Sequence, residues 1–317
     1  MNARSACPAL LFAALLAAPG REASAGAWSL DRGEYYTEIQ ASKYTTETLY
    51  STDGDRIEFP QTPWKLQQMA ASWRTQLGWR KRLNVLFGFT GLSVAGFEGP
   101  APGVPTNTGL SEIELGLHYR LANGSRALAL EALWTAPAGY DRELSTGLGD
   151  GRQQLAAALR WGSTLGPRAF AEATGGASYR FRKIGSPSAE ADLDPRRTSN
   201  VYVDLGAEIG FWVGRSTLLG GRYRGRLLAS TTGTGGPSNV HAVGPLVLTG
   251  DDQLDQALHL VGPMLLFRLD DRMDLLAGSF STAAGVNALH FDQVYVALAF
   301  KQSKLKRNQG LLGSTAK

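Results

Sequence analysis

Four histidines and one compact Ser-Asn-His group are the residues best suited to catalysis in this sequence. The histidines are His118, His241, His259 and His290, and the run from Ser238 to His241 places a nucleophile, an amide and a base together. A hydrolytic triad needs a histidine that contacts the serine and is itself oriented by Asn or Asp. Consecutive residues of a Gly-rich loop do not hold that geometry, so we expect no enzyme activity.

Two acidic clusters could bind a metal ion through oxygen ligands. Asp53-Gly54-Asp55 is one, and Asp251-Asp252 with Asp255 is the other. Calcium accepts such ligands, but a hairpin turn and a solvated loop explain these runs equally well. No His/Cys/Asp group has the spacing of a zinc site. We therefore expect neither a metal nor a cofactor.

The most informative polar residues alternate with apolar ones. Between Glu112 and Leu121, one face carries Ile113 and every second residue after it, and the other face carries Glu112, Glu114, His118 and Arg120. This period of two is typical of a β-strand with one apolar face. The same alternation places these side chains on inward faces: Arg74, Glu112, Glu114, His118, Arg120, Glu131, Arg160, Glu172, Arg180, Arg182, Asp204, Glu208, Arg222, Arg224 and Arg226.

These inward charges admit two interpretations. They can pair across neighbouring strands and fill the interior as a structural network. They can also line a water-filled constriction that selects solutes by charge. Arg222, Arg224 and Arg226 share one strand face and repel one another. Counting from the turn at 214–216 predicts Arg222 opposite Glu208 and Arg226 opposite Asp204, with Arg224 between them.

Strands of this kind recur along the whole chain and must position the charges. We predict twelve, and β-propensity with period-two alternation sets their limits. We expect a bulge at Gly262-Pro263, because proline cannot donate to a ladder. The predicted ranges are 33–44, 64–79, 83–97, 109–121, 126–136, 151–162, 169–182, 199–213, 217–229, 253–268, 272–281 and 291–300.

The connections between these strands alternate between short and long. Short turns such as Ala122-Asn123-Gly124-Ser125 lie between long segments at 45–63, 98–108, 137–150, 183–198, 230–252 and 282–290. Outer-membrane barrels have short periplasmic turns and long extracellular loops. Trp79, Tyr119, Trp161, Phe211 and Phe300 end the apolar faces near the short turns, as an interfacial aromatic belt would. The sequence therefore predicts an all-β fold, a transmembrane antiparallel up-and-down barrel.

The ends of the chain indicate export. Residues 1–25 combine Arg4, an apolar run from Ala9 to Ala18, and Ala23-Ser24-Ala25, which is a signal peptide with a cleavage site before Gly26. The single cysteine, Cys7, lies in this signal. Residues 26–300 would form the barrel and 301–317 a basic periplasmic tail. The net charge is +4; the signal carries +1 and the tail +5, so the barrel carries about −2, which gives no support for nucleic-acid binding.

Several stretches resemble one group of outer-membrane barrels, the MetA-pathway phenol-degradation family. The resemblance lies in 109–121, in Trp134-Thr-Ala-Pro-Ala-Gly-Tyr-Asp141, in 149–153 and in Ser178-Tyr-Arg-Phe-Arg182, and it extends over most of the mature chain. It implies an outer-membrane channel that passes small hydrophobic or aromatic solutes. The chain departs from many barrels in carrying 17 residues after Phe300.

We therefore expect an outer-membrane protein whose partners are membrane lipids, a small-molecule solute and the barrel-assembly machinery, with no nucleic acid. Passive passage of small solutes is the leading function. A structural or assembly-associated barrel with a plugged lumen is the alternative, supported by the dense Arg/Glu pairing. A lipid-modifying outer-membrane enzyme is a remote third possibility.

Overall fold

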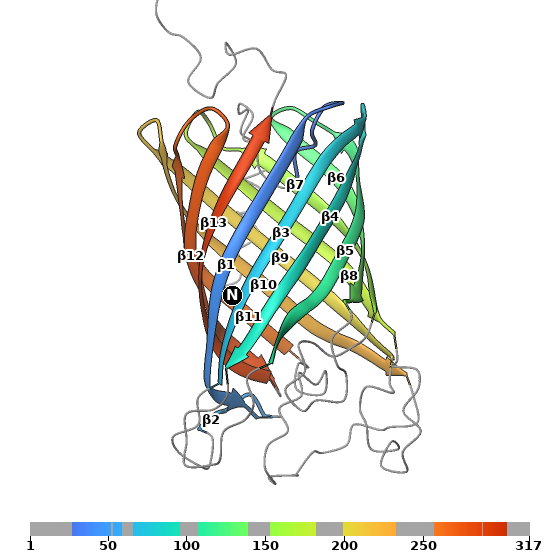
Figure 1. Ribbon diagram of the computed structural model, residues 1–317, viewed down its shortest axis with the longest axis vertical. Helices are drawn as coiled ribbons and strands as arrows, with labels where there is room; N and C mark the ends of the chain where they lie inside the picture. The colour runs from blue at the N-terminus through green and yellow to red at the C-terminus, as the bar shows by residue number, and fades with distance from the viewer. Residues whose placement is uncertain are drawn as a thin grey trace, which may run out of the picture.

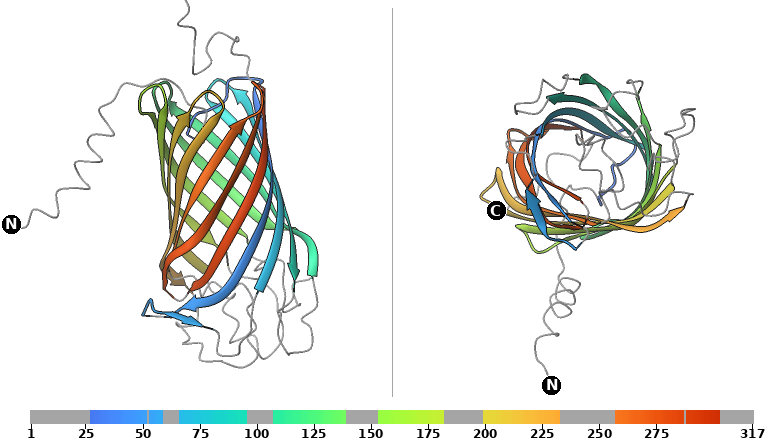
Figure 2. Two further views of the ribbon diagram at one scale, coloured as in Figure 1. Left: turned by 90° about the vertical axis from the view of Figure 1, so that its left-hand side faces the viewer. Right: turned by 90° about the horizontal axis from the view of Figure 1, so that it is seen from below.

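The chain folds as one closed antiparallel β-barrel (Figures 1 and 2). The computed structural model describes residues 27–51, 53–58, 66–95, 107–138, 153–181, 199–232, 257–286 and 288–302. Twelve long strands form the wall in chain order, and β13 pairs with β1 to close it. Closure leaves no wall strand with a free edge, which a membrane requires because lipid cannot hydrogen-bond to amides.

Each wall strand corresponds to one predicted strand. The short strand β2 (Arg56–Glu58) was not predicted, and it pairs with the far end of β1. The wall strands are β1 (Tyr35–Tyr50), β3 (Leu66–Arg80), β4 (Leu83–Ala95), β5 (Asn107–Ala122), β6 (Arg126–Pro137), β7 (Gln154–Thr164), β8 (Ala169–Arg180), β9 (Ser199–Val213), β10 (Thr217–Thr232), β11 (Ala257–Arg268), β12 (Met273–Val286) and β13 (Ala288–Gln302). Among the described residues, no helix is long and apolar enough to cross a membrane.

The outer surface of the wall is apolar. Met69, Ile209 and Val294 are 61%, 56% and 57% exposed, although each lies within a strand. Large apolar side chains are exposed in this way where lipid rather than water surrounds the wall. Trp79 and Phe211 stand at the short-turn end of the same surface, where the aromatic belt was predicted.

The five short turns gather at one end of the barrel, at the top of Figure 1. Gly124, Gly166 and Gly214 lie in three of these turns with φ of 118°, 89° and 84°, a conformation that only glycine adopts readily. Since outer-membrane barrels keep their short turns in the periplasm, this end is the periplasmic one. β13 also ends here.

Two predicted long connections are wrong at the opposite end. Residues 282–290 do not form a long loop, because β12 continues to Val286 and β13 starts again at Ala288. Within 45–63, β1 continues to Tyr50 and turns back into β2. β1 and β12 therefore extend beyond the part of the wall whose outer face is apolar. There, alternation of apolar and polar residues no longer marks the strands in the sequence. The other four predicted loops lie largely outside the described residues.

The bulge predicted at Gly262-Pro263 is also wrong in detail. The β11–β12 register is the same on both sides of this dipeptide, but no ladder pair forms at Gly262 or Pro263. The register shift lies nearby, between His259 and Leu260. A Cβ on Gly262 would collide with the Ser279 carbonyl group, so the dipeptide brings the two backbones together without a bulge.

The predicted signal peptide and most of the predicted tail lie outside the described residues. Lys301 was assigned to that tail, but it lies in β13 and its Nζ is 2.6 Å from Asp274 Oδ2. The Ser238–His241 group and the Asp251 cluster also lie outside the described part. Asp53 and Asp55 flank a turn in which both backbone amides donate to Ser51 Oγ.

Candidate functional site

The candidate site is the interior of the barrel. Cross-strand register fixes which residues share the inner face, because directly paired residues point the same way. By that register, Arg74, Glu114 and His118 face inward on β3 and β5, and Arg160 and Glu172 face inward on β7 and β8. The predicted inward residues that the structure describes all occupy inner positions; Arg182 lies outside the described residues.

One group of inward charges extends from β3 to β8. Arg74 donates to Glu114 Oε2 at 2.7 and 3.0 Å. Further round the wall, Arg160 bridges two acids, with Nη2 3.2 Å from Glu131 Oε1 and Nη1 3.3 Å from Glu172 Oε1. Glu112 also faces inward on β5, level with Thr90. These contacts form a cross-strand network of the kind predicted from the sequence.

A second group joins β8, β9 and β10. Arg222 Nε donates to Glu208 Oε2 at 2.7 Å, and Arg226 Nε donates to Asp204 Oδ1 at 2.9 Å. The predicted register is therefore confirmed, since Arg222 pairs with Glu208 and Arg226 with Asp204. Arg180 adjoins this group, because its guanidinium lies over the ring of Tyr202, as that of Arg226 does.

The segment before β1 lies inside the barrel and was not predicted. Trp28 Nε1 donates to the Gly124 carbonyl at 3.1 Å, and the Leu30 carbonyl accepts from Asn84 Nδ2 at 3.1 Å. The Ser29 hydroxyl lies 2.9 Å from His118 Nε2. We call residues 27–34 the N-terminal plug. Its contacts reach the inner face of β4, the inner face of β5 and the turn after β5.

Charged side chains also hold the N-terminal plug. Arg120 contacts both Asp31 Oδ1, at 3.2 Å, and the Lys81 carbonyl. The backbone amide of Ala27 donates to Glu172 Oε2 at 3.2 Å. Predicted inward residues His118, Arg120 and Glu172 therefore hold a segment of their own chain in the structure.

Two glycines make room for the N-terminal plug. A Cβ on Gly162 would lie 2.6 Å from two ring atoms of Trp28, and a Cβ on Gly78 would collide with the Asp31 carbonyl group. Any larger side chain at either inward position would clash with the plug. Glycine at these positions is therefore required by close approach rather than by a turn.

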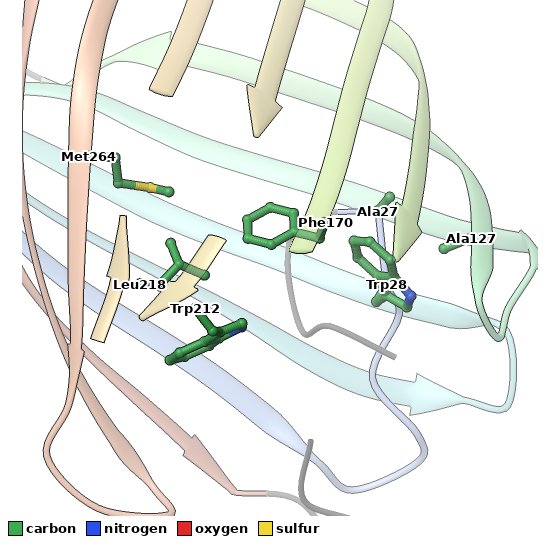
Figure 3. Packing of buried hydrophobic residues seen from close by; sticks show 7 residues of the cluster. All are labelled: Ala27, Trp28, Ala127, Phe170, Trp212, Leu218 and Met264. Atoms are coloured by element: carbon green, nitrogen blue, oxygen red, sulfur yellow. The ribbon is translucent and has the colours of Figure 1, made fainter. Parts of the chain in front are cut away.

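An apolar cluster fills the lumen beside the plug (Figure 3). It comprises Ala27, Trp28, Ala127, Phe170, Trp212, Leu218 and Met264. Phe170 and Leu218 are 4% and 2% exposed, so they are covered even though each points into the barrel. At its periplasmic end the interior is thus packed rather than open.

The inner wall differs from one arc of the barrel to another. Leu260, Met264, Leu276 and Phe280 line β11 and β12, and all four are buried. The inward acids of the two charged groups lie on β5 to β9, and the arginines that pair with them lie on β3, β7 and β10. The lumen is therefore amphipathic. β11 and β12 are apolar apart from the Arg268–Asp274 pair at their short-turn end, and the arc from β3 to β10 is charged.

Sequence reasoning missed both the plug and the apolar inner wall. The signal for the wall was present, because 258–267 is apolar at both parities: outward Val261 and Phe267 and inward Leu260 and Met264. A strand that is apolar on both faces has no polar lumen to face. The sequence of the plug has no alternation of polar and apolar residues. Only Trp28 and the inward glycines near the turns indicate that a segment packs inside the barrel.

The comparisons with known proteins agree with this fold. The chain is similar to the COG4313 outer membrane channel from Pseudomonas putida F1, with a TM-score of 0.65 and 15% identity over 89% of this chain and all of that one. This chain has an outer-membrane barrel fold. At such identity the likeness shows the fold alone. No protein-family model matches the chain, and no curated protein does.

Two further solved structures are more distant from this outer-membrane barrel. One is the NanC porin, with a TM-score of 0.49 and 6% identity over 84% of this chain and all of the porin. The other is the toluene transporter TodX of Pseudomonas putida, with a TM-score of 0.39 and 7% identity over 91% of this chain and 93% of the transporter. Neither similarity is close enough to carry an argument.

Proposed function

We propose that this protein is an outer-membrane channel for passive passage of small hydrophobic or aromatic solutes. The observation that carries the proposal is the amphipathic lumen. Partly exposed Leu258 and Leu266 lie beside buried Leu260 on one arc of the inner wall, and the charged network lines another arc. The free energy of an apolar solute falls when it leaves water for such a surface. The charged arc keeps contact with solvent, since the Arg74 side chain is 60% exposed and those of Asp204 and Arg226 are each 31% exposed.

Two further points support the proposal. The COG4313 protein of Pseudomonas putida F1, which shares this fold, is itself described as an outer membrane channel. The stretches 109–121 and 178–182 resemble the MetA-pathway phenol-degradation family, for which a channel for aromatic compounds is expected. We infer that outer-membrane lipids cover the apolar outer face and that the barrel-assembly machinery inserts the chain.

Uptake by proteoliposomes tests the proposal. Vesicles containing the folded protein should take up benzyl alcohol faster than protein-free vesicles, and glucose should enter no faster than in the control. An unrelated plugged barrel reconstituted at the same density controls for leakage. Equal rates for both solutes in all vesicles would contradict a channel for aromatic solutes. Bilayer conductance is a useful companion measurement, although a hydrophobic solute can pass without a current.

A specific observation favours the alternative, a structural barrel with a plugged lumen. The N-terminal plug and the apolar cluster together occupy the periplasmic end, and Trp28 is only 9% exposed. Passage then requires the plug to move. Uptake that appears only in variants with a weakened plug would support a gated channel, and no uptake in any variant would support the structural alternative.

A further inference from the structure

The middle arginine of β10 differs from its two neighbours. Arg222 faces Glu208 and Arg226 faces Asp204 on β9. Arg224 faces Gly206 on β9 and Leu260 on β11. Among the residues that the structure describes, no carboxylate pairs with Arg224. The barrel thus holds one inward guanidinium whose charge is not offset by an adjacent acid.

This guanidinium is nevertheless held in place. Its Cζ lies 4.7 Å from the centre of the Phe280 ring, a cation–π contact that covers one face of the planar group. Phe280 is 2% exposed and packs with Leu260 and Tyr295. Arg224 itself is exposed. Part of Arg224 is therefore accessible from the lumen.

The surroundings of Arg224 suit an anion with an apolar body. A guanidinium has N–H donors in a fork that matches a carboxylate, and it has no acceptor. Arg222 adds positive charge beside it, and its Nη1 donates to the Tyr295 hydroxyl at 3.0 Å. Buried Leu260 lies directly across from Arg224, and partly exposed Leu258, on the same inner face of β11, offers apolar surface next to the charge.

We propose that Arg224, oriented by Phe280, is the recognition group of a lumenal binding site for small aromatic carboxylates. The inference names a solute class for the proposed function. It rests on that function only in requiring that the solute can enter the lumen. Arg224 lies about 20 Å along β10 from Leu218 of the apolar cluster, six residues away at about 3.3 Å each. The site is therefore separate from the N-terminal plug.

Direct binding to the folded protein in detergent tests the proposal. The probes are benzoate, its neutral counterpart benzyl alcohol, and acetate, each measured by calorimetry or by ligand-observed NMR. Benzoate should bind more tightly than either of the others. Arg224→Gln should weaken benzoate at least about tenfold, as expected for loss of a charged hydrogen bond, and should leave benzyl alcohol within about twofold.

Three further variants sharpen this test. Arg224→Lys keeps the positive charge but loses the planar fork of N–H donors. Its benzoate affinity should therefore fall between those of the parent and Arg224→Gln. Phe280→Leu should also weaken benzoate, because the guanidinium loses its support. The matched control is the double variant Asp204→Asn with Arg226→Gln, which removes a neighbouring pair without changing net charge and should bind benzoate as the parent does.

Several outcomes would overturn the proposal. They are absence of benzoate binding to the parent, unchanged benzoate affinity in Arg224→Gln, and equal losses of benzoate and benzyl alcohol. Measuring benzoate binding and solute passage separately distinguishes the binding-site hypothesis from the channel hypothesis. If benzoate binds through Arg224 but no solute crosses proteoliposomes, the binding site stands and the channel fails. If benzyl alcohol crosses and Arg224→Gln changes nothing, the channel stands and the site fails.

Discussion

Replacing Trp28 by alanine should release the N-terminal plug. The indole is nearly buried between Gly162 and the apolar cluster, and its Nε1 donates to Gly124. Truncating a buried tryptophan to alanine costs about 3–5 kcal/mol, and every 1.4 kcal/mol is about a factor of ten in an equilibrium. The ratio of seated to released plug should therefore fall by about two to three and a half orders of magnitude, since the contacts of Ser29, Leu30 and Asp31 still favour the seated state.

Cysteine labelling measures this ratio. Cys7, in the predicted signal, is the only cysteine of the chain, so Ala27→Cys, at a plug position that is 1% exposed, introduces a unique thiol into the mature protein. With the plug seated, a maleimide should react slowly; in a Trp28→Ala background its rate should rise by about the factor above. Gly162→Ala should act in the same direction, because its Cβ would stand 2.6 Å from the indole.

The control is Trp79→Ala, which removes a tryptophan from the outer surface, where it is 56% exposed. This change should leave the labelling rate as it is in the parent. Equal labelling in the Trp28 and Trp79 variants would refute the reasoning, because it would mean that the indole contributes nothing to holding the plug.

Three other predictions concern the wall and the chain ends. Glu208→Ala should lower the free energy of unfolding by about 1–2 kcal/mol, since it leaves inward, partly exposed Arg222 without its acid; thermal denaturation followed by the heat-modifiable gel shift measures this. Arg224→Ala should leave that gel shift nearly unchanged, because no adjacent carboxylate loses a partner. Mass spectrometry of the outer-membrane protein should find Gly26 as the first residue, and a start at Met1 would contradict the predicted signal.

The wall could be predicted because one repeated constraint governs it. Apolar residues must alternate wherever a strand has lipid on one side and a polar interior on the other, as between Glu112 and Leu121. The tight turn at 214–216 then fixed the pairing of Arg222 with Glu208, since short hairpins leave no freedom in register. Strand ends that lie beyond the apolar outer face, such as Tyr50 and Val286, are not constrained to alternate in this way.

The interior could be predicted only in part, because its content depends on non-local contacts. Alternation says that Phe170 or Leu218 points inward, but not that both belong to one cluster with Trp28, from a segment more than a hundred residues earlier. The ion pairs of Arg120 and Glu172 were expected with other wall residues. In the structure Arg120 pairs with Asp31 of the N-terminal plug, and Glu172 accepts from the Ala27 amide of the plug as well as pairing with Arg160.

The contacts of the N-terminal plug also imply an order of assembly. Its hydrogen bonds join residues 54, 96 and 145 positions apart, to Asn84, Gly124 and Glu172. These partners sit on different arcs of the wall and come within reach of one short segment only after the strands have curved around it. Contacts of such long sequence separation form late. The first of these residues to be synthesised are therefore among the last to find their place, and a seated plug reports that the barrel around it is complete.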